Sequence, residues 1–301
     1  MPELQYPVLL KAVGGGGGKG IRTVRAPEEM KDAFTACVNE ARAAFGSDQV
    51  FLEKCLENVR HVEVQILADS FGNAIHLFDR DCTMQRRHQK MIEEAVSPFI
   101  SPEVKQKIYG DAVRIIRDIH YVGAATVEFL VDREEHYYFM EVNPRIQVEH
   151  PVTEMVTGLD IVKEQIRVAL GEPLAIRTPD APHGHAIQVR VNAEDPERDF
   201  MSSIGTVTGC TFPAGSGIRI ETFIHDGLRI TPYYDSMIAK IIVWAENREM
   251  AIKRMCYALD ELEIGGITTN VRLQKELLGT EAFASSSSHT TYVEDYLKNR
   301  T

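Results

Sequence analysis

The sequence predicts an α+β fold, arranged as one large domain or about two smaller ones. Strand-like segments occur in hairpin pairs, and separate amphipathic helices stand between these pairs. The chain has 301 residues, of which 44% are hydrophobic and 26% are charged. This length and composition can bury a sizeable core, which excludes a disordered chain and a small disulfide-stapled scaffold.

The N-terminal part predicts a hairpin with a long glycine tip, followed by a helix. Residues 8–13 and 21–25 have strand-like composition, and a run of five glycines stands between them. Apolar residues then recur with helical spacing over residues 30–45, and Gly46 marks the end of this helix.

The remaining elements are predicted from the period of apolar residues and from turn residues. Alternation predicts strands at residues 50–54, 62–68, 126–131 and 136–142. Helical spacing predicts three further helices, at residues 104–119, 160–170 and 248–262. Three prolines mark residues 172–183 as a linker, and the chain beyond it begins with strand-like segments.

Charge and composition exclude several classes of function and location. The formal net charge of −11 disfavours non-specific binding to nucleic acid or to a membrane surface. No run of about 18 apolar residues predicts a membrane span, and the first residues lack the pattern of a signal peptide. The five cysteines are scattered without a Cys-x-x-Cys pair, which indicates reduced thiols in the cytoplasm rather than a zinc or disulfide site.

The glycine-rich segment 14–20 formally matches a dinucleotide-binding fingerprint, but its context argues against that interpretation. The fingerprint requires a helix directly after the glycines, whereas residues 21–25 are strand-like. A Walker loop is excluded because Lys19 is followed by Gly20 rather than by serine or threonine. We expect a hairpin tip whose backbone N–H groups approach phosphates, flanked by Lys11 and Lys19. A plain surface loop is the alternative.

Two glutamates are predicted to face each other across the hairpin formed by residues 126–142. If its turn centres on residues 134 and 135, Glu128 lies directly opposite Glu141, where like charges repel. Neither glutamate has a basic neighbour within its own strand, so a divalent cation would relieve the repulsion. Asn143 points to the same face as Glu141 and can add an oxygen ligand. The pattern indicates a magnesium site, although two solvent-facing glutamates also fit it.

The next run, residues 143–151, contains two prolines and is predicted to be extended rather than helical. In an extended chain Arg145, Gln147 and Glu149 share one face. A cation, an amide and a carboxylate beside a metal pair suit a small planar oxyanion and a base. Upstream, residues 85–90 concentrate hydrogen-bond donors as a second anion-binding wall, although such a run is more often a solvated loop.

Seven segments, in the same order along nearly the whole chain, resemble biotin carboxylase, the ATP-grasp component of biotin-dependent carboxylases such as acetyl-CoA carboxylase. They are residues 11–20, 53–54, 60–65, 80–82, 85–90, 141–150 and 232–237. The resemblance implies an ATP-grasp fold followed by a biotin carboxylase C-terminal domain. The implied divisions are a partial lid at residues 1–56, a catalytic core at 57–182 and the C-terminal domain at 183–301. It further implies carboxylation of biotin with ATP, Mg²⁺ (or Mn²⁺) and bicarbonate, by way of carboxyphosphate.

The resemblance also implies the roles of individual residues. Nucleotide would be held by Lys11, Gly17, Gly18, Glu53, Lys54, Leu56, His61, Gln85, His88, Glu128 and Glu141. Metal ions would be held by Glu128, Glu141 and Asn143. Bicarbonate would be bound by Lys90, Arg145, Gln147 and the backbone of Val148, with Glu149 as the base that deprotonates it. Arg219 would stabilise the biotin enolate.

The implied partners lie on other chains. No Ala-Met-Lys-Met motif occurs, so we expect biotin on a separate biotin carboxyl carrier protein, a carboxyltransferase as a second partner, and a homodimer for the intact protein. Relative to the family, the chain starts after an N-terminal α/β domain and a further ATP-contacting lysine. Residues 200–205 also replace a segment that usually contains proline. The alternatives are another ATP-grasp ligase, such as a carbamoyl-phosphate synthase, and a non-catalytic ATP-binding remnant.

Overall fold

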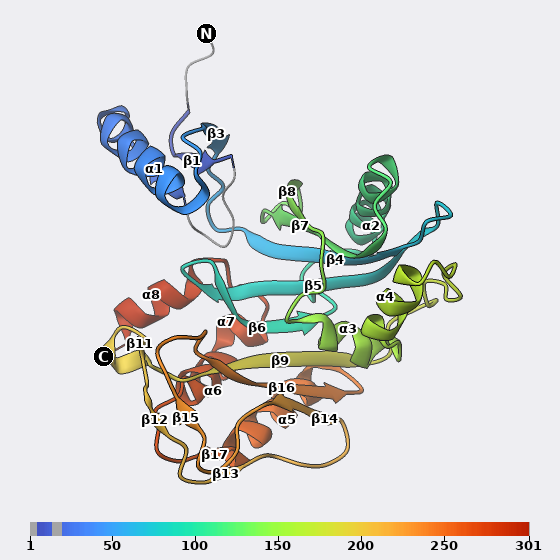
Figure 1. Cartoon of the computed structure of the whole chain (residues 1–301), viewed down its shortest axis with the longest axis vertical. Coiled ribbons are helices and arrows are strands. Elements are labelled where there is room, and N and C mark those ends of the chain that lie inside the picture. Colours follow the sequence, from blue (N-terminus) through green and yellow to red (C-terminus); the bar gives the residue numbers. More distant parts are fainter. Residues whose placement is uncertain (1–4, 14–19, 301) are drawn as a thin grey trace.

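The computed structural model describes residues 5–13 and 20–300, and its centre is one eight-stranded sheet (Figure 1). From edge to edge the strands are β14 (Ile218–Thr222), β16 (Met237–Ala245), β9 (His185–Asn192), β6 (Gln89–Ala95), β5 (Ala74–Arg86), β4 (Arg60–Ala68), β7 (Gly123–Val131) and β8 (Tyr137–Asn143). Every neighbouring pair is antiparallel. Because β6 pairs with β9, the sheet continues from the expected catalytic core into the expected C-terminal domain.

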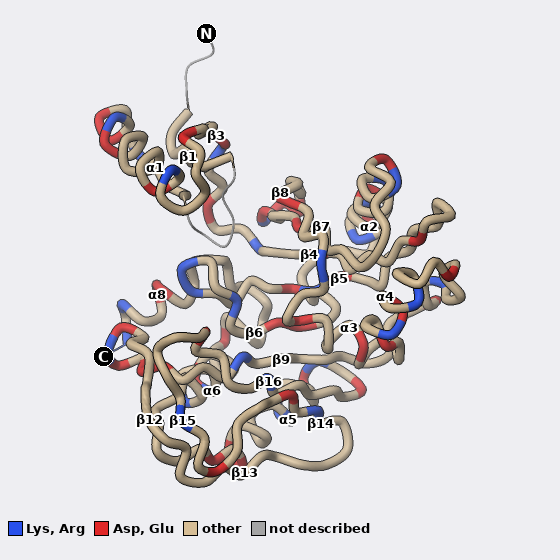
Figure 2. The backbone as a smooth tube through the Cα atoms, in the orientation of Figure 1, with Lys and Arg blue, Asp and Glu red and all other residues tan. Residues whose placement is uncertain are grey.

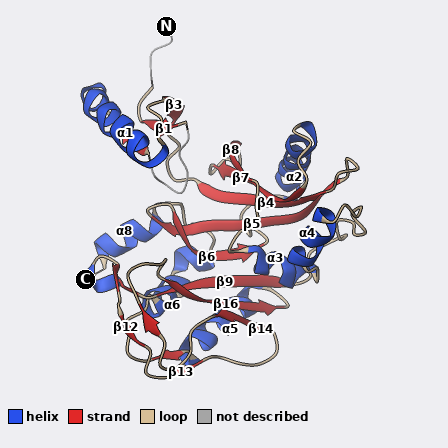
Figure 3. Ribbon diagram, viewed as in Figure 1, coloured by secondary structure: helices blue, strands red, loops and turns tan. Residues whose placement is uncertain are grey.

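Helices cover both faces of the sheet (Figure 3). On one face, α2 (Pro102–Asp118) packs on β4 and β5, and α5 (Arg248–Glu261) packs on β9 and β16. On the opposite face lie α3 (His150–Thr157) and α4 (Ile161–Ala169). Three helices follow α5 along the chain, namely α6 (Val271–Leu278), α7 (Glu281–Ala284) and α8 (Tyr292–Asn299).

The alternation of β4 sorts apolar and polar side chains to the two faces of the sheet. Val62, Val64 and Ile66 belong to the core beneath α2 and are fully buried. Glu63 and Gln65 point to the other face, toward α3, and are equally buried. Since water cannot reach it, the carboxylate of Glu63 needs ionic partners within the protein.

The N-terminal hairpin and its helix form a small separate layer beside the main sheet (Figure 1). β1 (Val8–Ala12) pairs with β2 (Ile21–Val24) and with β3 (Val50–Lys54), and α1 (Met30–Phe45) packs on them. Its core consists of four buried side chains, those of Val8, Leu10, Val24 and Cys37. Gly46 ends α1 with a φ of +67°, a left-handed conformation that favours glycine.

Short elements connect the longer strands. They are β10 (Glu194–Asp195), β11 (Met201–Ser202), β12 (Gly205–Thr206), β13 (Cys210–Thr211), β15 (Arg229–Ile230), β17 (Glu263–Ile264) and the 3-10 turns η1 (Pro27–Glu29) and η2 (Pro196–Arg198). Figure 2 shows acidic and basic residues interspersed along the elements. Among the described residues, no helix combines the length and apolar character needed to cross a bilayer. All five cysteines are free thiols in the structure.

The structure confirms the α+β class and most predicted elements, and it corrects the run after β8. Residues 144–149 are irregular, but α3 begins at His150 and holds Pro151 in its first turn, where the missing N–H costs no hydrogen bond. Within the polar run 85–90, Gln85 and Arg86 end β5 and residues 89–90 begin β6, whereas Arg87 and His88 form the exposed turn between them. Helices α3, α6, α7 and α8 have no counterpart among the predicted elements. The predicted glycine tip, residues 14–18, lies outside the described residues.

Candidate active site

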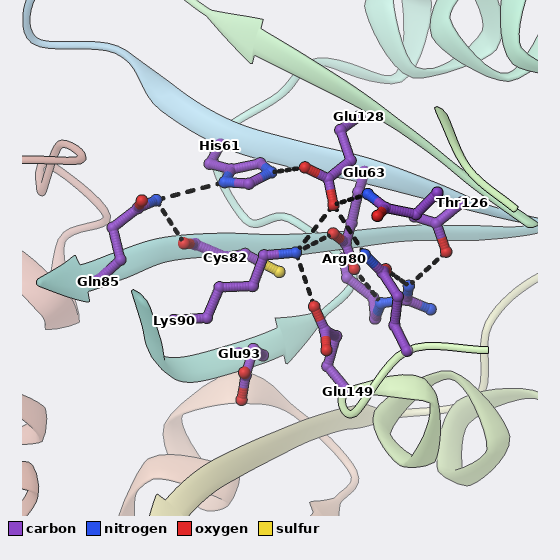
Figure 4. A network of polar contacts seen from close by, with 12 residues as sticks. His61, Glu63, Arg80, Cys82, Gln85, Lys90, Glu93, Thr126, Glu128 and Glu149 are labelled. Carbon is purple, nitrogen blue, oxygen red and sulfur yellow. Dashed lines mark hydrogen bonds and ion pairs between the residues drawn. The ribbon is translucent and has the colours of Figure 1, made fainter. Parts of the chain in front are cut away.

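Lys90 lies at the centre of a buried ionic network on the α3 side of the sheet (Figure 4). Its ammonium nitrogen lies 2.5 Å from Glu63 Oε2, 2.7 Å from Glu149 Oε1 and 3.1 Å from Glu128 Oε1. These acids come from β4, from the turn before α3 and from β7, so the network joins distant parts of the chain. One ammonium cannot balance three carboxylates, and further cations are therefore required.

The first further cation is Arg80 on β5, whose side chain is fully buried. Its five N–H groups donate to oxygens of five side chains, those of Glu63, Gln65, Thr126, Gln147 and Thr153, over 2.6–3.2 Å. Because Gln147 Oε1 accepts from Arg80, its Nε2 is left to donate to Glu128 Oε1 at 2.8 Å. Arg80 thus fixes the orientation of the Gln147 amide.

The second further cation is Arg190 on β9. Its Nη2 donates to Glu149 Oε2 over 2.9 Å, and its Nε donates to Glu93 Oε1 over 2.5 Å. Gln188 Nε2 donates to the other oxygen of Glu93 over 3.1 Å. Glu93 is fully buried, and it holds the guanidinium of Arg190 at Nε while Nη2 donates to Glu149.

Glu128 and Glu141 face each other across β7 and β8, which confirms the register predicted from the hairpin. A bulge follows Glu128, and the pairs nearer the turn are offset by one residue from that prediction. The side-chain amide of Asn143 donates to Glu128 Oε1 over 3.0 Å and to Glu141 Oε1 over 3.1 Å. The amide N–H groups therefore occupy the position between two carboxylate oxygens that suits a cation.

His61 on β4 and Gln85 on β5 extend the network beyond Glu128. His61 Nε2 lies 2.9 Å from Glu128 Oε2, and its Nδ1 lies 3.3 Å from Gln85 Nε2. Since the Gln85 amide donates to Nδ1, the proton of a neutral His61 ring lies on Nε2 and faces Glu128. Lys90 and His61 are thus the basic neighbours of Glu128, and both come from other strands.

The network favours the charged forms of Glu149, Glu128 and Lys90. Burial would raise the pKa of Glu149, but the charges of Lys90 and Arg190 outweigh it and hold that pKa well below its usual range. Burial is likewise outweighed at Glu128, where His61 and Lys90 lower the pKa. Burial would lower the pKa of Lys90, but the acidic groups around it, Cys82 and the three glutamates, raise it well above its ordinary value.

The three-stranded sheet of β2, β1 and β3 and the connection after it carry several of the predicted nucleotide-binding residues. Lys11 Nζ on β1 lies 3.0 Å from Glu53 Oε2 on β3, so these two side chains form an ion pair. The ammonium of Lys54 lies 5.9 Å from the ring centroid of Tyr138 on β8. Leu56 is half-buried in the connection between β3 and β4. The described contacts do not bring these residues into the Lys90 network.

His88 is also separate from the network. It is exposed at the tip of the β5–β6 hairpin and makes no hydrogen bond with the described residues. Gly17 and Gly18, predicted to hold ATP phosphates, lie outside the described residues.

The turn into α3 separates Arg145 from Gln147 and Glu149, in contrast to the predicted common face. Gln147 and Glu149 are buried in the network, whereas Arg145 is exposed and donates to Asn143 Oδ1 over 3.3 Å. The chain bends before α3 rather than continuing extended, and this bend moves Arg145 to the rim of the site. The carbonyl oxygen of Val148, between the two buried residues, accepts from Lys240 Nζ over 3.1 Å.

Arg219 is not part of the network. On β14 its Nη1 donates to Glu154 Oε2 over 2.7 Å, and its Nη2 pairs with Glu221. β14 is two strands away from β9, which carries Arg190. Arg190, rather than Arg219, is the arginine that contacts Glu149.

Sequence reasoning missed four charged members of the network. Each stands inside a strand, and the four are Glu63, Arg80, Glu93 and Arg190. A charge at an interior strand position is a visible signal, because a buried charge needs a partner. Which charges meet depends on the pairing of β4, β5, β6 and β9, and the local pattern does not contain that information.

The arrangement can perform two chemical tasks. An ammonium and a guanidinium hold the carboxylate of Glu149, and the Gln147 amide donates to the neighbouring Glu128, which suits binding a small oxyanion and accepting its proton. Next to them, the carboxylate oxygens of Glu128 and Glu141 converge on the amide nitrogen of Asn143, and a divalent cation held at this position would neutralise phosphate charge.

The family models divide the chain into two parts. Residues 1–177 match the model described as carbamoyl-phosphate synthase L chain, ATP binding domain, and residues 188–295 match the biotin carboxylase C-terminal domain. The biotin carboxylase of Nostoc sp. is 47% identical over 297 residues, which cover 98% of this chain and 66% of the relative. A pyruvate carboxylase subunit of Methanothermobacter thermautotrophicus is 47% identical over 98% of this chain and 60% of its own length. The chain thus spans just under two thirds of these relatives.

Solved structures agree with these matches. The biotin carboxylase domain dimer of Hydrogenobacter thermophilus 2-oxoglutarate carboxylase, in complex with MgADP, ADP and bicarbonate, has a TM-score of 0.95 and 47% identity. The match covers 98% of this chain and 65% of that one. The biotin carboxylase of Campylobacter jejuni has a TM-score of 0.94 and 42% identity, over 97% of this chain and 65% of that one. The C-terminal match separates the chain from a carbamoyl-phosphate synthase. The chain therefore belongs to the biotin carboxylase family and carries that family's ATP-grasp and C-terminal domains.

Proposed function

We propose that this chain carries the biotin-carboxylating centre of a biotin-dependent carboxylase. The overall reaction converts biotin, bicarbonate and MgATP into carboxybiotin, ADP and phosphate. The observation that carries the proposal is Glu149, held between Lys90 and Arg190 beside the facing pair of Glu128 and Glu141. The related Hydrogenobacter domain, with MgADP and bicarbonate together, supports the same substrates here.

Glu128, Glu141 and Asn143 would hold the Mg²⁺ (or Mn²⁺) that accompanies ATP. The fit rests on the convergence of Glu128 Oε1 and Glu141 Oε1 on the Asn143 amide, within 3.1 Å of one nitrogen atom. Rotation of the amide would present its oxygen to the same point, giving the hard oxygen ligands that Mg²⁺ prefers. When bound, the cation would neutralise charge on the transferred phosphoryl group.

Two groups of residues would bind the nucleotide around this metal pair. His61 and Gln85 lie next to Glu128 in the network. The others are the residues of the lid and of the β5–β6 tip, namely Lys11, Gly17, Gly18, Glu53, Lys54, Leu56 and His88. Closure of the lid over bound ATP would bring the two groups together and exclude water.

Bicarbonate would lie against Lys90, Gln147 and the backbone of Val148, with Arg145 at the exposed side. Glu149 would take the bicarbonate proton, and its basicity would rise as Lys90 turns toward the bound anion. A bicarbonate oxygen then attacks the γ-phosphorus of ATP, the bond to ADP breaks, and carboxyphosphate is formed. The residues supply position and charge, which are the main requirements of phosphoryl transfer.

In our proposal Arg190, in place of Arg219, stabilises the charge that develops on the ureido oxygen of biotin. Carboxyphosphate divides into CO₂ and phosphate, the phosphate takes the N1′ proton, and N1′ forms the new bond to carbon. Arg190 is suited to this role because Glu93 holds its guanidinium at Nε while Nη2 contacts Glu149.

The proposal places biotin on a separate carrier protein and assigns the final transfer to a separate carboxyltransferase. A homodimer is proposed for the intact protein, by analogy with the Hydrogenobacter domain dimer. The acceptor is chosen by the carboxyltransferase, and relatives are named for pyruvate and for methylcrotonoyl-CoA. An acetyl-CoA carboxylase, acting in fatty acid biosynthesis, belongs to the same proposed range. The five free thiols suit the reducing cytoplasm.

Formation of ADP tests the proposal. The chain would be incubated with MgATP, with and without bicarbonate and free biotin, and with and without the N-terminal α/β domain of a complete relative. We expect that domain to raise the rate at least about tenfold, and only when bicarbonate is present. A rate that ignores bicarbonate, with a Glu149→Gln variant as active as the parent, would contradict the proposal.

A further inference from the structure

The tip of the β5–β6 hairpin is a strained two-residue turn. Arg87 and His88 have φ angles of +48° and +63°, in the left-handed region that Asn and Gly normally occupy in such turns. Gln85 stands just before this tip and Lys90 just after it, and both belong to the buried network. Because arginine and histidine disfavour this conformation, contacts from outside the hairpin must stabilise the tip.

A second strained turn lies against this tip. Asp199 and Phe200, which follow η2, have φ angles of +49° and +60° although neither is glycine. Both residues belong to the C-terminal part of the chain, and Asp199 is 113 positions from Arg86 in the sequence. Phe200 also opens the segment that replaces the proline-containing stretch of the family.

The two turns hold each other through Arg86. Its guanidinium carbon lies 3.7 Å from the ring centroid of Phe200, and its Nη2 donates to Asp199 Oδ1 over 2.7 Å. Arg87 Nη2 donates to the same oxygen over 3.2 Å, and the backbone N–H of Arg87 donates to Glu294 Oε1 over 2.6 Å. A stacked and hydrogen-bonded guanidinium is a rigid connection, since planar geometry and two kinds of contact fix it together.

The position of His88 depends most on this connection. Lys90 has three carboxylate partners, and Gln85 is held by His61 and by the carbonyl of Cys82. His88 makes no hydrogen bond with any residue that the structure describes. The contacts of Arg86 and Arg87 with Asp199, Phe200 and Glu294 therefore fix the position of the tip that carries His88.

We infer that Asp199 and Phe200 are positioning residues for the nucleotide, acting through the hairpin tip that carries His88. This inference rests on the proposed function, in which His88 contacts ATP. The C-terminal domain would thus contribute to nucleotide affinity without touching the nucleotide. The effect should fall on the KM for ATP rather than on kcat or on the KM for bicarbonate, because Lys90 keeps its own three partners.

The test compares Phe200→Leu, which removes the aromatic ring that Arg86 stacks on, with Phe200→Tyr, which keeps an aromatic ring there. Affinity for MgATP would be measured by calorimetry, and ATP and bicarbonate kinetics in the assay with the N-terminal domain. We expect Phe200→Leu to weaken MgATP affinity about fivefold, with kcat unchanged, and Phe200→Tyr to remain within about twofold of the parent. Phe223→Leu is the matched control, because Phe223 is an exposed phenylalanine at the end of β14.

Hydrogen exchange of residues 86–89 provides a readout that does not depend on turnover. Faster exchange in Phe200→Leu than in Phe223→Leu would show that Phe200 holds the hairpin tip. This readout remains valid if the parent chain binds no MgATP. Absence of MgATP binding would count against the proposed function, not against this inference. Asp199→Asn should accelerate the same amides if Phe200→Leu does not fold. Unchanged exchange in the folded variants would overturn the inference. So would equal MgATP affinities of Phe200→Leu and Phe223→Leu when the parent binds MgATP.

Discussion

The guanidinium of Arg190 donates to Glu149 Oε2 over 2.9 Å, and this contact joins β9 to the turn before α3. Lys90 reaches the other oxygen, Oε1, over 2.7 Å. Each oxygen of the carboxylate is therefore held by a different cation, and the group cannot rotate without losing one of them. This fixed carboxylate is the feature around which the proposed chemistry is arranged.

The first prediction concerns Arg190→Lys. Lysine keeps the charge but cannot bridge Glu93 and Glu149 at once, because it lacks the planar fork of arginine. We expect loss of at least about 90% of biotin-dependent ADP formation, MgATP affinity within about twofold, and a free energy of unfolding lower by about 1–3 kcal/mol. Steady-state kinetics, calorimetry and urea unfolding measure these three quantities.

Arg219→Lys is the matched control for this prediction. Arg219 contacts Glu154 and Glu221 on another part of the sheet, so its conservative replacement should leave the biotin-dependent rate within about threefold of the parent. A severe loss in Arg219→Lys together with a normal rate in Arg190→Lys would return the biotin role to Arg219.

The second prediction concerns the facing glutamates. Glu141→Gln removes one of the two carboxylates without changing the shape of the side chain. We expect MgATP affinity to fall about tenfold, because Mg²⁺ loses a charged oxygen ligand, while the melting temperature stays close to that of the parent. Glu134→Gln, at an exposed position of the same hairpin, should bind as the parent does. Equal calorimetric affinities for the two variants would remove the metal assignment.

The sequence alone predicts part of this site. Glu128 and Glu141 are close in the chain and joined by one hairpin, so alternation and turn position predict that they face each other. The bulge after Glu128 shows the limit of such reasoning, because the predicted turn centre does not hold for the pairs nearer the turn. Local patterns also predict β1, β2, α1 and α2.

The rest of the site depends on contacts between distant segments. Glu93 and Arg190 are 97 positions apart and meet because β6 pairs with β9, a pairing that no local pattern predicts. Arg190 and Arg219 both stand inside strands, and only the strand order decides which of them reaches Glu149. The helix that begins at His150 is not predicted for a different reason. Pro151 disfavours a helix everywhere except in the first turn, and that is where it lies.

The third prediction is an acid limit to stability. Burial alone would raise the pKa of Glu149 and Glu128, but their cationic neighbours lower both below the unfolded value of about 4.3. Such groups contribute stability that is present above the unfolded pKa and is lost as pH falls through the folded pKa. We therefore expect these two carboxylates to make the free energy of unfolding decrease from about pH 5 downward.

Urea unfolding between pH 7 and pH 3 checks this dependence by difference. Glu63 and Glu93 act in the opposite direction, because burial raises their pKa, so the parent alone does not isolate the effect. Glu149→Gln should lose less stability than the parent on going from pH 5 to pH 3, whereas Glu134→Gln should follow the parent. Parallel curves for all three proteins would show that Glu149 is not held as an ion pair.

Transfer of oxygen from bicarbonate to phosphate tests the central claim most directly, namely that this centre phosphorylates bicarbonate. If a bicarbonate oxygen attacks the γ-phosphorus, that oxygen stays with phosphorus when carboxyphosphate divides. With ¹⁸O-labelled bicarbonate, MgATP, biotin and the added N-terminal domain, we predict one ¹⁸O atom in each phosphate released, and almost no phosphate from Glu149→Gln. Phosphate that is released in step with ADP but takes its one new oxygen from water, without ¹⁸O, would contradict the account.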